Sequence, residues 1–80
     1  MNNSDGSYNR KRAYTLKAKI REVHGGIAVN CDQISRVART IGGYDPNNLQ
    51  EQLLGTHGDL SFLVFQGRAQ ENKIGRLYSF

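Results

Sequence analysis

The sequence predicts a small, mostly α-helical domain that ends in a β-hairpin, so that three helices precede two strands. Apolar residues recur at steps of three and four between residues 13 and 41, which is the period of an amphipathic helix. Pairs of glycines at 25–26 and 42–43 interrupt that period, as helix ends do. After residue 59 the apolar residues become consecutive, aromatic and branched, which is typical of a strand. Eighty residues allow one domain at most.

Residues 13–24 fit two patterns. As a helix, the segment carries one apolar stripe, made of Ala13, Leu16, Ile20 and Val23. As a strand, it alternates apolar residues with Lys17, Lys19 and Arg21. Its Ala, Leu, Lys and Glu content and the following glycine pair favour the helix. The strand alternative gives a mixed α+β domain with a three-stranded sheet, whose basic face would meet an RNA backbone.

The second helix is the clearest in the sequence. Residues 27–29 form a short apolar link, and Asn30 or Asp32 provides the cap of a helix that runs to Ile41. One face of this helix carries the apolar residues Cys31, Ile34, Val37, Ala38 and Ile41. We therefore expect Cys31, Ile34 and Val37 in the core.

A third, short helix is predicted over residues 46–54, because Asp45 is a suitable cap and Pro46 suits the first helical position. Its Leu49 and Leu53 are expected to face the core, and Gly55 is expected to end it. Residues 60–65 are predicted as a strand, residues 66–72 as a polar loop and residues 73–80 as a second strand. The two strands would form a β-hairpin.

The basic residues are concentrated at the beginning of the chain. Residues 1–21 contain six basic residues and one acid, whereas residues 22–80 contain five basic residues and six acids, within a formal net charge of +4. Residues 1–12 contain little that could be buried and are expected to form a flexible basic arm before a folded domain at 13–80. This distribution predicts a polyanionic partner, with nucleic acid as the first choice. The alternative is an arm that only increases solubility.

Several functional classes find no support in the sequence. Cys31 is the only cysteine, which excludes an internal disulfide and a cysteine-rich metal site. His24 and His57 lie beside glycines, where capping or exposure to solvent is expected and not metal binding. No P-loop, dinucleotide-binding fingerprint or nucleophile motif is present, so we expect no enzyme, cofactor or metal. No apolar run is long enough to span a membrane, and we expect a soluble cytoplasmic protein.

The order of the predicted elements over residues 13–80 resembles the winged helix-turn-helix family of DNA-binding domains. The likeness lies in a first helix that ends at Gly25-Gly26, an apolar link, a second helix, a turn with Gly42-Gly43, a third helix and a C-terminal two-stranded wing. It implies a small transcriptional regulator that binds double-stranded DNA, in some members as a homodimer, with the third helix in the major groove. Base contacts then fall to Asn47, Asn48, Gln50 and Gln52, and phosphate contacts fall to Arg10, Lys11, Arg12, Arg36, Arg39, Arg68, Lys73 and Arg76.

One feature of the sequence favours a different partner. Residues 40–67 contain no Lys or Arg but contain Asp45, Glu51 and Asp59, which is the wrong charge for a helix that approaches phosphate. The alternative function is a protein-binding adaptor or inhibitor module, in which the third helix meets a partner protein. The aromatic residues near the C-terminus, which are Phe62, Phe65, Tyr78 and Phe80, would either stack on bases or belong to a core or interface.

Overall fold

The first helix begins earlier than the sequence predicts. The computed structural model describes residues 8–44 and 47–80. Helix α1 spans Arg10–His24, so the helical interpretation of residues 13–24 is confirmed. The side chain of Asn9 caps it by accepting a hydrogen bond from the backbone N–H of Arg12 at 3.0 Å, and Gly25 ends it with φ +64°. Residues 10–12 therefore lie in α1 and not in a flexible arm, whereas residues 1–7 fall outside the described residues.

The apolar link and the second helix form β1 (Val29–Asn30) and α2 (Cys31–Ala38). Asn30 and Gln33 form a reciprocal cap, because each side chain accepts the other residue's backbone N–H at 2.9 Å. The helix ends at Ala38 and not at Ile41. Ile34 and Val37 are buried as predicted. Cys31 is exposed, which corrects the prediction, because it begins the helix ahead of the first buried turn.

The third helix departs most from the prediction. Helix α3 spans Leu49–Phe65 and absorbs both the short helix expected over 46–54 and the strand expected over 60–65. The side chain of Asn48 caps it, accepting the backbone N–H of Glu51 at 3.1 Å; the expected cap at residues 45–46 lies outside the described residues. The buried positions recur at steps of one, three and four, which is helical, and they are Gln52, Gly55, Thr56, Asp59, Leu60 and Leu63.

Gly55 is a point of close approach and not a helix end. A Cβ atom at this position would lie 3.1 Å from Nη2 of Arg12 and 3.4 Å from the ring of Tyr44. This packing places one face of α3 against α1, and it turns the predicted inward leucines outward. Leu49 and Leu53 are 57% and 48% exposed, so their assignment to the core was wrong.

The three strands form one antiparallel sheet in the order β1-β3-β2. Strand β2 spans Gln70–Asn72 and β3 spans Leu77–Ser79, so the predicted loop at 66–72 contains a strand and the predicted strand at 73–80 begins later. Tyr78 is the central residue, paired with Val29 on one side and Glu71 on the other. In the connection between β2 and β3, the side chain of Asn72 accepts the backbone N–H groups of Ile74 and Gly75, both at 3.1 Å.

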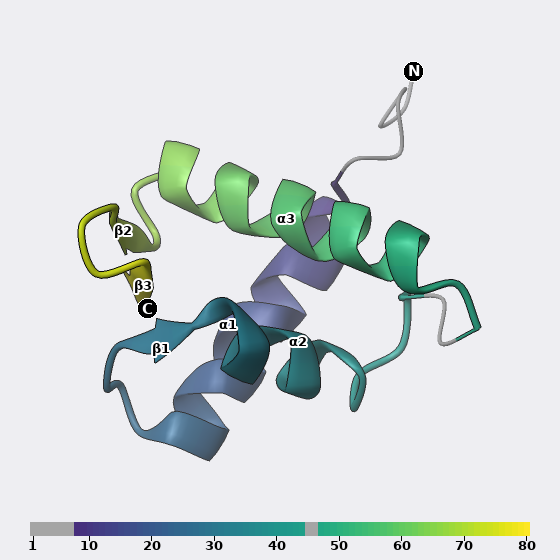
Figure 1. The fold of residues 1–80 in the computed structure, drawn as a ribbon, viewed down its shortest axis with the longest axis horizontal. Helices are drawn as coiled ribbons and strands as arrows, with labels where there is room; N and C mark the ends of the chain where they lie inside the picture. Colours follow the sequence, from purple (N-terminus) through teal and green to yellow (C-terminus); the bar gives the residue numbers. More distant parts are fainter. Residues whose placement is uncertain (1–7, 45–46) are drawn as a thin grey trace.

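Over the described residues, the chain is therefore a small α+β fold with three helices and a three-stranded antiparallel sheet. The alternative prediction took residues 13–23 as one strand of a three-stranded sheet. These residues are helical, and β1 is the strand that completes the sheet instead. Helix α3 lies on one side of α1 and α2, and the sheet lies beside the C-terminal end of α3 (Figure 1). The main core joins side chains of all three helices to β1 and β3, and it includes Leu16, Ile20, Val29, Ile34, Leu60 and Tyr78. None of the described helices is both long and apolar enough to cross a bilayer.

Candidate nucleic-acid interface

One face of α1 carries a stripe of basic residues. Arg10, Tyr14, Lys17 and Arg21 follow one another at steps of four, three and four, which places them on one side of the helix. Arg68, in the turn that follows α3, joins this stripe, because its guanidinium carbon lies 5.3 Å from the centre of the Tyr14 ring. We call Arg10, Lys17, Arg21 and Arg68 the basic surface.

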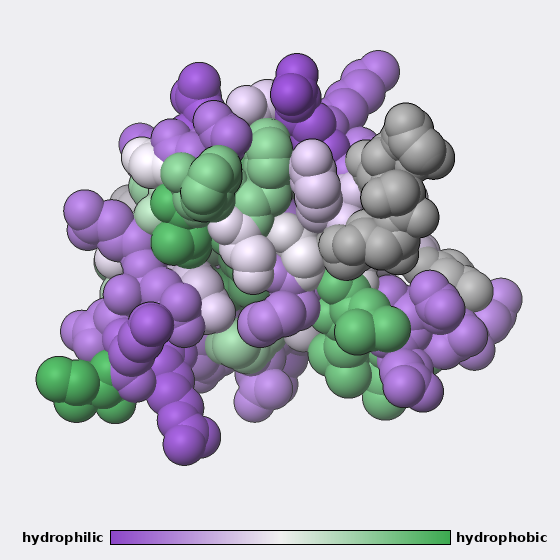
Figure 2. Space-filling model, turned by 90° about the horizontal axis from the view of Figure 1, so that it is seen from above, coloured by the Kyte–Doolittle hydropathy of each residue, from purple (hydrophilic) through white to green (hydrophobic). Residues whose placement is uncertain are grey.

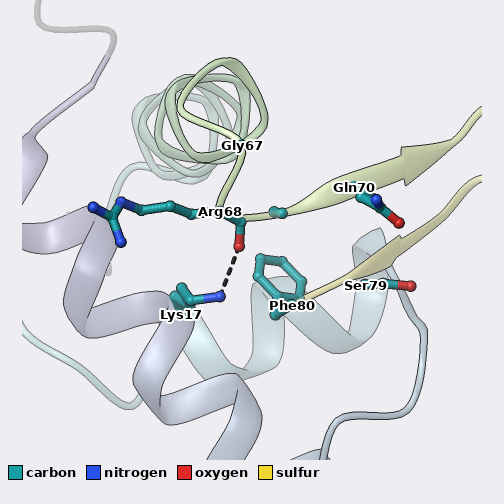
Figure 3. Close-up of a pocket in the computed structure, with 7 residues that line it drawn as sticks. Lys17, Gly67, Arg68, Gln70, Ser79 and Phe80 are labelled. Carbon is teal, nitrogen blue, oxygen red and sulfur yellow. Dashed lines mark hydrogen bonds between the residues drawn. The ribbon is translucent and has the colours of Figure 1, made fainter.

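A hollow of about 390 Å³ lies within the basic surface, between α1, the turn after α3 and the ends of β2 and β3 (Figure 3). Lys17 reaches across it, and its Nζ donates a hydrogen bond to the carbonyl oxygen of Arg68 at 2.7 Å. Nη1 of Arg21 donates to the main-chain oxygen of Phe80 at 2.6 Å. These two bonds hold two cations at the hollow through main-chain oxygens. None of the described residues that line the hollow is Asp or Glu.

The charged form of Lys17 is disfavoured at this position. Its pKa lies below the ordinary lysine value, first because partial burial disfavours the charged amine and then because Arg21 and Arg68 repel it. An anion placed in this hollow would lower the repulsion among the three cations. The arrangement therefore suits a phosphate group better than a neutral ligand.

Aromatic rings extend the basic surface toward α3. The ring of Tyr14 meets the ring of Phe62 edge to face, with centroids 5.9 Å apart, and Phe62 stacks on Tyr8 at 4.9 Å. Beyond them lies a second hollow of about 660 Å³, which we call the aromatic hollow; its lining includes Tyr8, Arg10, Leu54, His57, Phe62 and Phe65. Phe65 is 86% exposed, so it is not a core residue.

Arg12 does not belong to the basic surface, because its side chain pairs with Asp59. Its side chain is 17% exposed and forms an ion pair with Asp59, whose side chain is fully buried, with Nε and Oδ2 2.6 Å apart. Tyr44 donates its hydroxyl to the same carboxylate, and the backbone N–H of Asn9 donates to it at 2.8 Å. Burial, followed by the hydrogen bond to Asp59, raises the pKa of Tyr44. This arrangement leaves Arg12 a structural role, in contrast to its predicted contact with phosphate.

The remaining predicted residues lie on separate parts of the surface. Arg10 and Lys11 are exposed at the start of α1, Arg36 and Arg39 are exposed on or beside α2, and Lys73 and Arg76 lie in the connection between β2 and β3. At the start of α3, Asn47 and Gln50 are exposed and Asn48 serves as the cap. Gln52 is only 3% exposed and faces the interior, so a base could not reach it in this structure.

Sequence reasoning missed the aromatic part of the surface. From the sequence, Lys17 and Arg21 count in the basic segment 1–21 but receive a nucleic-acid contact only in the strand alternative, and Phe62 and Phe65 fall in a predicted hairpin. The spacing of Arg10, Tyr14, Lys17 and Arg21 in a helix was a usable signal. The contacts of Tyr14 with Phe62 and Arg68 could not be predicted from the sequence, because these residues are far apart in the chain.

The N-terminal half of α3 exposes a group of leucines. Leu49, Leu53 and Leu54 are 57%, 48% and 56% exposed, and we call them the exposed leucines. Figure 2 looks onto the side of the molecule that carries α3 and shows apolar patches between hydrophilic side chains. His57, predicted at a helix end, lies within α3 and is exposed, and His24 is the last residue of α1. The described residues contain no group of three or more His, Cys, Asp or Glu suited to a metal ion.

Searches with this chain against protein-family models, curated proteins and solved structures found no match.

Proposed function

We propose that this chain is a small nucleic-acid-binding regulator of the winged-helix type, which holds a DNA backbone on its basic surface. The element order α1-β1-α2-α3-β2-β3 and the sheet order β1-β3-β2 support the winged-helix assignment. A fold alone does not decide a function, so the DNA-binding proposal depends on the site.

The observation that carries the proposal is the proximity of Lys17, Arg21 and Arg68 at one hollow whose described lining contains no Asp or Glu. Three cations that repel one another are unfavourable for stability, and their arrangement suits a phosphate. Lys73 and Arg76, exposed between β2 and β3, would add contacts as a wing does. Two copies of so small a domain would give the area that specific DNA binding requires.

We place the contact with DNA on the basic surface and not at the start of α3. Residues 40–67 supply no cation, Asn48 is used as a cap and Gln52 is buried. Phosphate contacts provide most of the affinity of a DNA-binding protein, so a surface without cations is a poor docking site.

The test is a titration of labelled mixed-sequence duplex DNA with the protein at two salt concentrations. Lys17→Gln and Arg68→Gln should each weaken binding, and each should reduce the slope of log K against log salt by about 0.9. Arg39→Gln is the matched control, because it removes one exposed charge from a residue that lines neither hollow. Equal losses of DNA affinity in all three variants would show that net charge alone attracts DNA and would contradict a specific role of the basic surface.

Gln50→Ala tests the other placement. The side chain of Gln50 is exposed at the start of α3, so its removal should leave folding and duplex binding unchanged. Loss of sequence preference in this variant would move the DNA contact to α3, as the family resemblance implies.

A second candidate function is protein binding, which the exposed leucines favour. Leu49 and Leu53 lie one helical turn apart on α3 and are about half exposed, and proteins commonly bury such apolar surface against a partner. Glu51 is exposed in the same part of α3, and residues 40–67 contain no Lys or Arg, so a suitable partner would present an apolar segment with basic residues beside it. Leu53→Asp should then abolish capture of such a partner and leave duplex DNA binding intact. If Leu53→Asp removes DNA binding instead, the leucines belong to the DNA interface.

A further inference from the structure

The aromatic hollow differs in chemistry from a surface that only contacts a phosphate backbone. Its lining includes Tyr8, Phe62 and Phe65 together with Arg10. Phe65 is 86% exposed, although burial of a phenylalanine is strongly favourable in a folded chain. An exposed aromatic ring in a hollow that an arginine also lines is an arrangement on which unpaired bases can stack.

The aromatic hollow and the basic surface are continuous. Arg68 lies over Tyr14, the ring of Tyr14 meets Phe62, and Phe62 stacks on Tyr8, which lines the aromatic hollow. Arg10 belongs to the basic surface and also lines the aromatic hollow. A single strand that crosses this surface would therefore meet both cations and aromatic rings.

We propose that the aromatic hollow binds an unpaired base of a single-stranded nucleic acid, stacked on Phe65, while the adjoining phosphates lie on the basic surface. This inference rests on the proposed function, since it assumes that the basic surface binds phosphate. The inference restricts the ligand to a single strand, because the bases of a duplex stack on one another and a side chain cannot reach their faces. The hollow would accept any base, because each base has an aromatic face.

No described acidic residue lines the aromatic hollow, so none of its described lining residues repels a phosphate. His57 also lines it and lies exposed on the same helix as Phe65. An apolar protein segment would gain contacts from Phe65 but would bring no negative charge to Arg10 in the hollow or to Arg68 beside Tyr14. The mixture of rings and cations therefore favours a single strand over an apolar peptide.

The test compares a labelled oligothymidylate of about 12 nucleotides with a duplex of the same length. We expect the single strand to bind at least about 10-fold more tightly, as one stacked base would provide. Phe65→Ala should remove about that factor for the single strand and leave duplex affinity unchanged. Leu49→Ala is the matched control, an exposed apolar residue of the same helix that lines neither hollow. Oligouridylate distinguishes RNA from DNA as the source of the strand.

A direct readout is available because the chain contains no tryptophan. In Phe65→Trp, the single indole should be quenched when oligothymidylate binds and should not respond to duplex. Equal affinity for strand and duplex, with both Phe65 variants indifferent, would overturn the inference and leave the proposed function intact. Lys17→Gln should weaken the binding of both the single strand and the duplex. If the unmodified protein binds neither of them, both proposals are overturned.

Discussion

The guanidinium of Arg12 and the carboxylate of Asp59 form a buried pair that links the beginning of α1 to the middle of α3. Nε lies 2.6 Å from Oδ2 and Nη2 lies 3.2 Å from Oδ1. Arg12 also donates to the carbonyl oxygen of Gly43 at 2.7 Å and lies 4.3 Å from the centre of the Tyr44 ring. One arginine therefore fixes three parts of the chain, and Asp59 compensates its charge.

Loss of the charge on Asp59 should destabilise the protein strongly. Asp59→Asn leaves Arg12 largely buried without a counter-ion, and we expect the free energy of unfolding to fall by about 3–5 kcal/mol. The control is Glu22→Gln, which breaks the exposed pair of Lys19 and Glu22, 3.4 Å apart, and should cost less than about 1 kcal/mol. Urea denaturation of both variants measures the difference. Similar midpoints for the two variants would show that the buried pair contributes little.

The two glycines before Tyr44 should respond differently to a methyl group. Gly43 has φ +100°, and a Cβ there would lie 2.9 Å from Cδ of Arg12. Gly43→Ala should therefore lower the free energy of unfolding by at least about 1–2 kcal/mol. Gly42 has nothing within 4 Å of its Cβ position, so Gly42→Ala should be close to neutral. Thermal melts of the two variants at one protein concentration decide the matter, and equal melting temperatures would contradict the geometry.

Truncation to alanine should reduce the free energy of unfolding much more at Ile34 than at Leu53. Ile34 is fully buried, and Ile34→Ala should cost about 2–5 kcal/mol. Leu53 is 48% exposed, and Leu53→Ala should cost less than about 1 kcal/mol. Chemical denaturation followed by circular dichroism gives both values. A large loss of stability in Leu53→Ala would mean that the outer face of α3 is covered in solution.

The pKa of Lys17 offers a test of the basic surface in the absence of any ligand. It should lie below the ordinary lysine value, and Arg68→Gln should raise it only in part, because partial burial is the larger cause. Since the folded-state pKa is the lower one, the unfavourable contribution of Lys17 to stability is present at neutral pH. That contribution disappears as pH rises through the folded and then the unfolded value, near about 10.5. Titration of the Lys17 side chain by NMR measures the shift; an unchanged pKa in Arg68→Gln would mean that the two cations do not interact.

The sequence was sufficient for elements whose signals are local. The apolar stripe of α1 and the glycine after it predicted that helix, and the Asn30 cap with Ile34 and Val37 predicted α2 and its buried face. Each of these signals lies within one element, where helical spacing and capping act directly. The concentration of charge in the first part of the chain was also evident, and α1 carries most of it.

Only the tertiary structure decided α3 and the surface built on it. A glycine at position 55 is typical of a helix end, and the composition of residues 60–65 is typical of a strand. In the structure, Arg12 and Tyr44 pack closely against Gly55 and Asp59, and these contacts favour one continuous helix. That helix brings Phe62 to Tyr14 and Tyr8, and the turn after it brings Arg68 to Lys17. These contacts join residues about fifty positions apart in the chain. Local propensity contains no information about such pairs, because burial and ion pairing across the core override the preference of a short segment.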